Sequence, residues 1–94
     1  PLADEILFTK AQISLREGKF QDADTLLQEL VSLYPWDILA DNALMMRASL
    51  HEEKLNDPAT AMELYQRLMT DYPGSLFVVE ARKRFRELRG DVVN

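Results

Sequence analysis

Apolar residues recur at intervals of three and four along most of the chain, which is the spacing of one face of an α-helix. The clearest runs lie in residues 23–31 and 61–69. No segment sustains the period-two alternation of a half-buried strand. The one strand-like run, residues 76–79, follows Ser75 and is interpreted as the first turn of a helix. The pattern predicts about five helices, over residues 3–17, 21–33, 38–54, 58–71 and 76–89.

Residues with special backbone preferences mark the ends of these helices. Gly18 and Gly90 are predicted to end helices because glycine tolerates the left-handed conformation. Pro35 cannot continue a helix, since it lacks an N–H and clashes with the preceding turn. Helix starts are indicated by residues that cap or open a first turn, namely Asp37, Asp57 followed by Pro58, and Ser75.

The first helix is expected to pack through one small-to-medium apolar face. That face consists of Ala3, Ile6, Leu7, Ala11 and Ser14. Phe8 and Leu15 lie off this face, so they are available for another contact.

The dipeptide Tyr-Pro occurs twice, at residues 34–35 and 72–73. Each copy closes the same apolar pattern, and corresponding positions lie 38 residues apart. Self-similarity at this period indicates a stacked array of repeats. Arrays of this kind present extended binding surfaces.

The small residues of both copies resemble the tetratricopeptide repeat family. In the first copy the matching positions are Ala11, Gly18, Phe20, Ala23, Leu27, Leu30 and Pro35. In the second copy they are Ala48, Ala61, Tyr65, Leu68 and Pro73. The second copy departs from the family pattern, because its turn at residues 56–58 lacks the glycine and the aromatic residue and is one residue longer.

The resemblance implies an all-α fold of antiparallel helix pairs in a right-handed superhelix. It implies a first pair over residues 3–35 and a second over 37–73. A capping helix over 75–90 and a frayed tail at 91–94 would follow. The last helix carries Arg86 where the preceding repeat has Ala48, as expected of a cap with a polar outer face. The chain is therefore expected to be the C-terminal end of a longer array. It begins at Pro1 rather than Met, which also indicates a fragment.

Units with a long linker that end in Tyr-Pro resemble those of bacterial cell-envelope proteins, such as the periplasmic partner of the Tol-Pal system. This resemblance implies a periplasmic or envelope location. The chain has 94 residues, no cysteine, and a net charge of −5. The absence of cysteine excludes disulfides and thiolate metal sites. The acidic body argues against a nucleic-acid surface. No apolar run reaches the length needed to span a bilayer.

The resemblance places a protein-binding surface on the concave side of the array. The residues expected there are Phe8, Gln12, Leu15, Met45, Ser49, Glu52, Lys83 and Arg86. One interpretation is an apolar peptide groove with a basic end. The other is that Phe8 and Leu15 pack on an upstream repeat or on a second copy of the chain, giving a homo-oligomer. The Lys and Asn residues of the carboxylate-clamp subclass are missing, which argues against a chaperone-tail adaptor.

Five basic residues cluster near the C-terminus, namely Arg82, Lys83, Arg84, Arg86 and Arg89. Arg82, Arg86 and Arg89 lie along one helical stripe. They could receive an acidic partner segment or anionic lipid, or they could be solvated cations at the negative end of a helix. The tripeptide Arg89-Gly90-Asp91 matches an integrin-binding sequence, but Gly90 as a helix stop explains it better.

No residue pattern supports catalysis, a cofactor or a metal. His51, the single histidine, is expected to pack between helices rather than act as a ligand or base. Trp36 is expected to cover the end of a helix pair. The sequence thus predicts a non-catalytic protein-interaction or scaffold module. The alternatives are a structural cap that self-associates and a regulatory domain attached to an enzyme.

Overall fold

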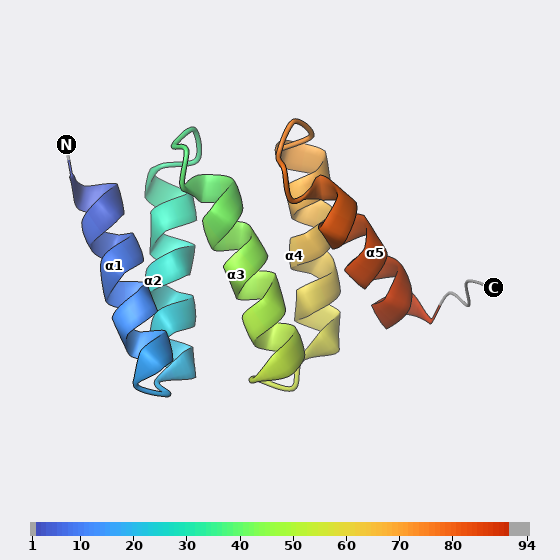
Figure 1. Cartoon of the computed structure of the whole chain (residues 1–94), viewed down its shortest axis with the longest axis horizontal. Helices are drawn as coiled ribbons and strands as arrows, with labels where there is room; N and C mark the ends of the chain where they lie inside the picture. The colour runs from blue at the N-terminus through green and yellow to red at the C-terminus, as the bar shows by residue number, and fades with distance from the viewer. Residues whose placement is uncertain (1, 91–94) are drawn as a thin grey trace.

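The computed structural model describes residues 2–90, in which five helices follow one another. They are α1 (Ala3–Arg16), α2 (Phe20–Leu33), α3 (Ala40–Glu53), α4 (Pro58–Asp71) and α5 (Val78–Arg89). No β-strand occurs in this part of the chain, so the expected all-α fold is confirmed. Figure 1 shows the helices side by side in a row, alternately up and down.

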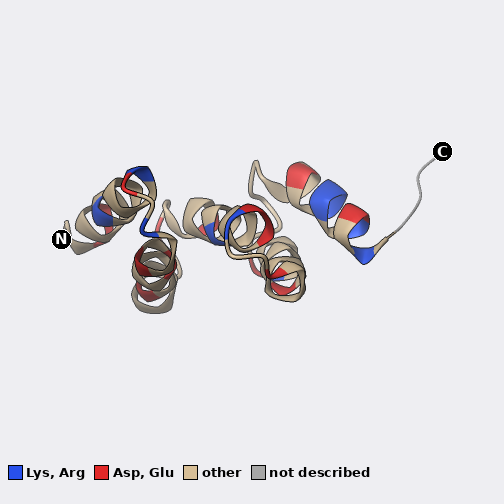
Figure 2. Ribbon diagram, turned by 90° about the horizontal axis from the view of Figure 1, so that it is seen from below, with Lys and Arg blue, Asp and Glu red and all other residues tan. Residues whose placement is uncertain are grey.

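The helices form an elongated slab of 46 × 29 × 16 Å. The main contacts join each helix to the next one along the chain, which is the contact pattern of a repeat array. Seen from below, α1, α3 and α5 lie on one side of the slab, and α2 and α4 lie on the other (Figure 2). The side formed by α1, α3 and α5 is the one that carries the candidate site.

Pairs of alanines mark the places where helices approach one another. Ala11 and Ala23, in α1 and α2, are completely buried. Ala48 and Ala61, in α3 and α4, are also completely buried. Close-packed interiors leave little room for larger side chains at such positions. The core around these alanines is built mainly from leucines and one tyrosine, namely Leu27, Leu30, Leu44, Leu64, Leu68 and Tyr65.

Two glycines end helices as expected. Gly18 and Gly90 have φ values of +77° and +90°, in the left-handed region that glycine adopts without steric cost. Asp57 caps α4, because its carboxylate accepts a hydrogen bond of 3.2 Å from the Thr60 N–H, and Pro58 is the first helical residue. The proposed tail at 91–94 lies outside the described residues.

The expected caps of α3 and α5 are displaced by a short turn. The Asp37 carboxylate accepts a bond of 2.9 Å from the Leu39 N–H, and the Ser75 hydroxyl accepts one of 3.0 Å from the Phe77 N–H. Both helices begin one residue after that bond, so their predicted starts at 38 and 76 were two residues early. Asp37 and Ser75 lie 38 residues apart and make equivalent hydrogen bonds, so the sequence repeat is matched by a repeated backbone turn.

The expected packing face of α1 was right only in part. Ala11 is completely buried, and Leu7 packs against the main core. Ala3 is exposed and Ile6 is 52% exposed. Phe8 is half-buried and packs against the main core, and Leu15 is half-buried too. The packing face is fixed by Ala11, which must meet α2, and apolarity alone did not reveal this direction. Ile6 therefore points away from the stack, and Phe8 points into it.

Candidate functional site

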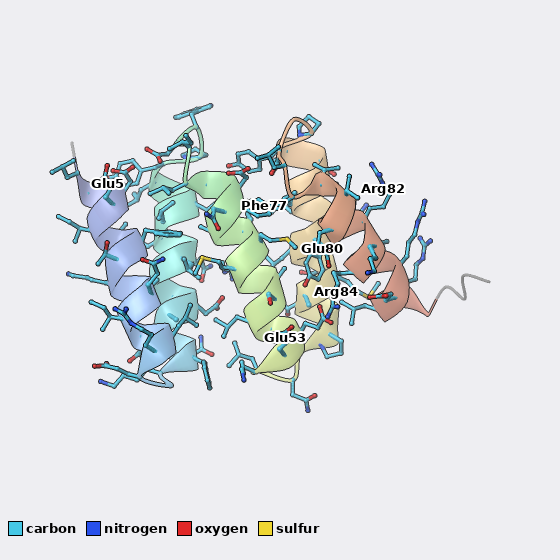
Figure 3. The ribbon with its side chains drawn as sticks, viewed as in Figure 1. Glu5, Glu53, Phe77, Glu80, Arg82 and Arg84 are labelled. Carbon is cyan, nitrogen blue, oxygen red and sulfur yellow. The ribbon has the colours of Figure 1, made fainter. Side chains whose placement is uncertain are left out.

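An apolar groove of about 460 Å³ lies between α1, α3 and the turn before α5. Its walls are mostly aliphatic, thioether and aromatic side chains, chiefly Leu15, Phe20, Met45, Met46, Leu50 and Phe77. In Figure 3, Phe77 reaches from the turn before α5 toward α3. Apolar hollows with a few polar groups at the edge are the usual form of a binding site.

Each wall of the groove follows from local structure. Met45 and Ser49 are one turn apart on α3, so they share a face and both border the groove. Leu15 comes from the last turn of α1, and Phe20 is the first residue of α2. The left-handed Gly18 allows the chain to reverse between them.

Charged residues stand at one end of the groove. Glu53 and Lys54 follow each other at the end of α3 and both border it. The Lys54 ammonium lies 5.7 Å from the centre of the Phe20 ring, within the range of a cation–π contact. The site is thus an apolar trough with one acid and one base at its rim.

The structure brings together only part of the predicted surface. Leu15, Met45 and Ser49 border the groove. Gln12 is exposed on α1, and Phe8 packs against the core. Lys83 and Arg86 border a separate hollow on α5, so the expected basic end is not continuous with the apolar groove.

Glu52 is engaged elsewhere. It accepts a bond of 2.8 Å from the Tyr65 hydroxyl and is paired with the Arg84 guanidinium. The bond between Arg84 Nε and Glu52 Oε1 is 3.2 Å. These contacts join α3, α4 and α5. Figure 3 shows Arg84 directed into the stack and Arg82 directed away from it. From the sequence, Arg84 was expected among the exposed cations, so this pairing was not predicted.

Burial and hydrogen bonding shift two groups of this network. Desolvation, followed by the hydrogen bond to Glu52, raises the pKa of Tyr65. The bond to Glu52 raises the pKa of Arg84. At neutral pH a tyrosine is neutral and an arginine is charged without any shift, so the two shifts extend these protonation states to more alkaline pH.

A second buried network joins α2 to α3. Arg47 Nε donates a bond of 2.8 Å to Asp24 Oδ1, and both residues are more than nine-tenths buried. His51 Nε2 lies 3.0 Å from the same oxygen, and Nδ1 lies 3.5 Å from Asp57 Oδ2. Neither ring nitrogen makes a hydrogen bond within the described chain. His51 is packed between helices, which is the placement the sequence analysis favoured.

Apolar side chains are exposed on the turns that join the repeats. Trp36 is 93% exposed, and Ile38 and Leu76 are similarly open. The expectation that Trp36 covers the end of a helix pair was therefore wrong. The neighbouring Pro35 carbonyl accepts a hydrogen bond from the Tyr72 hydroxyl, while the indole of Trp36 lies in solvent.

Other kinds of site find little support in the described residues. No group of three or more metal-ligating side chains in residues 2–90 could hold an ion. No helix there is both long and apolar enough to cross a bilayer. Arg89 lies over the Phe85 ring, and Gly90 ends α5, while Asp91 lies outside the described residues.

Comparison with known proteins gives one match. A family model described as "Tetratricopeptide repeat" matches residues 5–35 and 42–75. These two segments contain most of the α1–α2 and α3–α4 pairs. No curated protein and no solved structure matches the chain.

Proposed function

Because the chain belongs to the tetratricopeptide repeat family, we propose that it is a non-catalytic module for protein interaction or assembly. Members of this family generally bind other proteins or serve as scaffolds. The observation that carries the proposal is the apolar groove bounded by Leu15, Met45 and Phe77. We take residues 3–35 and 37–73 as two repeat units and residues 75–90 as a terminal helix.

The groove favours a peptide or helix that presents apolar side chains. Methionine has a flexible, polarisable side chain, so Met45 and Met46 can adjust to ligands of different shape. Glu53 and Lys54 at the rim can pair with charges that flank the apolar residues. Because rim pairs contribute mainly to orientation and association rate, apolar contact is expected to supply most of the affinity.

The proposal is tested by selecting peptides from a randomised library for binding to the unsubstituted chain, here called the parent. The affinity of the selected peptide is then measured. Ser49→Lys places a charged side chain in the groove from a half-buried position, and we expect it to weaken binding at least tenfold. Gln66→Lys introduces the same charge at an exposed position of α4 that does not border the groove, and it should leave the affinity unchanged.

Melting temperatures of the two variants show whether both are folded. Equal affinity for Ser49→Lys and the parent would exclude the groove as the binding site.

A structural cap that self-associates is the second candidate. Leu44 and Ala48 are buried in α3, whereas the equivalent positions of α5 carry the exposed Arg82 and Arg86. Cations there discourage a further apolar helix from packing, which is consistent with the C-terminal part of a longer array. Sedimentation at increasing concentration separates the candidates, since only self-association gives a concentration-dependent mass.

A bacterial cell-envelope location is a further part of the proposal. Its support is the resemblance of the long Tyr-Pro units to envelope proteins. Fractionation of bacterial cells that express the full-length gene would test it, and we expect the protein in the periplasmic or envelope fraction.

A further inference from the structure

The internal repeat shows what covers one face of α3. Ala11 of α1 corresponds to Ala48 of α3, so equivalent residues of these helices lie 37 positions apart. Four residues of α3 at helical spacing are buried, and they form one stripe. They are Ala40, Ala43, Arg47 and Leu50. Arg47 is bonded to Asp24 of α2, which shows that α2 packs on this stripe.

The same stripe on α1 is uncovered. Its equivalent residues are Ala3, Ile6, Lys10 and Ile13. Ile6 is 52% and Ile13 40% exposed, and Ala3 and Lys10 are exposed too. The chemistry nevertheless matches the covered stripe position by position, as a small residue, an apolar residue, a cation and an apolar residue. An exposed face of this composition indicates an interface.

The surface around this stripe is hollowed. Leu2, Glu5, Ile6, Thr9 and Lys10 surround a shallow depression on the outer side of α1, and Glu5 is seen on this outermost helix in Figure 3. Among residues 2–90, Lys10 has no ion-pair partner, whereas its equivalent Arg47 has Asp24. A helix that packed here could therefore supply the missing carboxylate.

The two turns that contain Tyr-Pro, here called the Tyr-Pro joints, give a second, independent indication that this face is covered. The Tyr72 hydroxyl donates a bond of 2.6 Å to the carbonyl of Pro35 in the preceding joint. Its equivalent, Tyr34, makes no such bond within the described chain. The first unit therefore has the equivalent donor, the Tyr34 hydroxyl, but the described chain offers it no equivalent of the Pro35 carbonyl.

We propose that the face formed by Ala3, Ile6, Lys10 and Ile13 binds the second helix of a further repeat unit. That helix has the residue pattern of α2. It carries a carboxylate at the position of Asp24, which pairs with Lys10, and the turn after it offers a carbonyl to Tyr34. This inference goes beyond the proposed function, because it concerns neither the groove nor its ligand.

The test uses a duplicated chain in which a second copy of residues 3–39 is placed directly before Ala3. Leu39 precedes Ala40 in the natural sequence, and Ala40 is the equivalent of Ala3, so this junction keeps the repeat register. We expect one cooperative unfolding transition at a higher melting temperature than that of the parent. The added unit supplies both an Asp24 and a Pro35 carbonyl.

Charge reversal shows whether the predicted contact forms. Lys10→Glu in the original copy should lower the melting temperature of the duplicated chain and leave that of the parent nearly unchanged. Asp24→Lys in the added copy should restore much of the loss, because it inverts the pair. Tyr34→Phe in the original copy should lower the melting temperature of the duplicated chain but not that of the parent. Peptide binding is not measured, so failure here is separate from failure of the groove.

Three results would overturn the inference. The added unit could unfold in a separate transition, or Lys10→Glu could have the same effect in both chains. A dimer of the parent that Lys10→Glu abolishes would show that a second copy of the chain occupies this face instead.

Discussion

The hydroxyl of Tyr72 donates a hydrogen bond of 2.6 Å to the carbonyl oxygen of Pro35. Both residues belong to the repeated Tyr-Pro dipeptide, so the bond ties one inter-repeat joint directly to the other. The adjacent Ser75 hydroxyl donates to Asp41 Oδ2 at 2.5 Å, which fastens the second joint to the start of α3. The dipeptide therefore stacks the two units as well as ending their second helices.

Tyr72→Phe is expected to lower the free energy of unfolding by about 0.5–1.5 kcal/mol, the usual net contribution of a hydrogen bond. The ring remains in place, and only the donor to Pro35 is lost. Tyr34→Phe is the matched control, because this equivalent tyrosine makes no such bond in the described chain. Urea denaturation measures both variants. Equal losses would mean that the joint-to-joint bond contributes nothing.

Ala23→Leu and Ala61→Leu are each expected to destabilise the fold by about 1–3 kcal/mol through overpacking. Both alanines are completely buried between paired helices, so a larger side chain forces the backbones apart. Ala59→Leu is the control, since Ala59 is exposed on the same helix as Ala61. If the buried and exposed variants have the same thermal melting temperature, the close helix contacts are assigned wrongly.

The sequence predicted those features of the fold that rest on spacing. Helical periodicity located all five helices within about two residues at each end. The capping residue Asp57 and the stop at Gly18 depend on local backbone chemistry, which a short stretch of sequence contains. The buried alanines were found because the repeat places them at equivalent positions.

Features that depend on direction around a helix axis were harder to predict. The face of α1 was assigned by apolarity, although Ile6 is exposed and Phe8 is half-buried. A terminal helix leaves one apolar stripe uncovered, so apolarity alone cannot distinguish its two faces. Arg84 and Glu52 were assigned to solvent or the binding surface because each was considered singly. Their pairing becomes evident only when α5 is packed against α4, which brings Arg84 to Glu52 of α3.

The buried pair of Asp24 and Arg47 is expected to be costly to break. Removing one partner leaves an uncompensated charge in the interior, which typically costs about 3–5 kcal/mol. Asp24→Ala should lose about this much, and Glu29→Ala on the exposed side of α2 should lose less than about 0.5 kcal/mol.

The double variant Asp24→Leu with Arg47→Met removes both charges. It should lose much less free energy of unfolding than Asp24→Ala, because no unpaired charge then remains in the interior. Chemical denaturation of the four chains measures these effects. A double variant as unstable as Asp24→Ala would show that the pair contributes through packing shape rather than through charge.

Tyr65 is expected to make the fold sensitive to alkaline pH. Burial raises its pKa above the ordinary value of 10.0, so the folded chain holds this proton more tightly than the unfolded chain. The resulting stabilisation is complete below about pH 10. It is lost as pH rises further, because the unfolded state then releases the proton and the folded state does not. Tyr65→Phe should therefore show a shallower decline of unfolding free energy above pH 10 than the parent.

Burial also raises the pKa of Tyr72, so Tyr72 contributes to the alkaline loss of stability as well. Comparing Tyr72→Phe with Tyr65→Phe separates the contribution of each tyrosine to that loss. Urea denaturation across the alkaline range gives the slopes, and tyrosinate absorbance reports ionisation directly. Near neutral pH, Tyr65→Phe should lose only about 0.5–1.5 kcal/mol, because Glu52 keeps its pairing with Arg84. An unchanged alkaline slope in Tyr65→Phe would mean that Tyr65 ionises in the folded chain as readily as in the unfolded one.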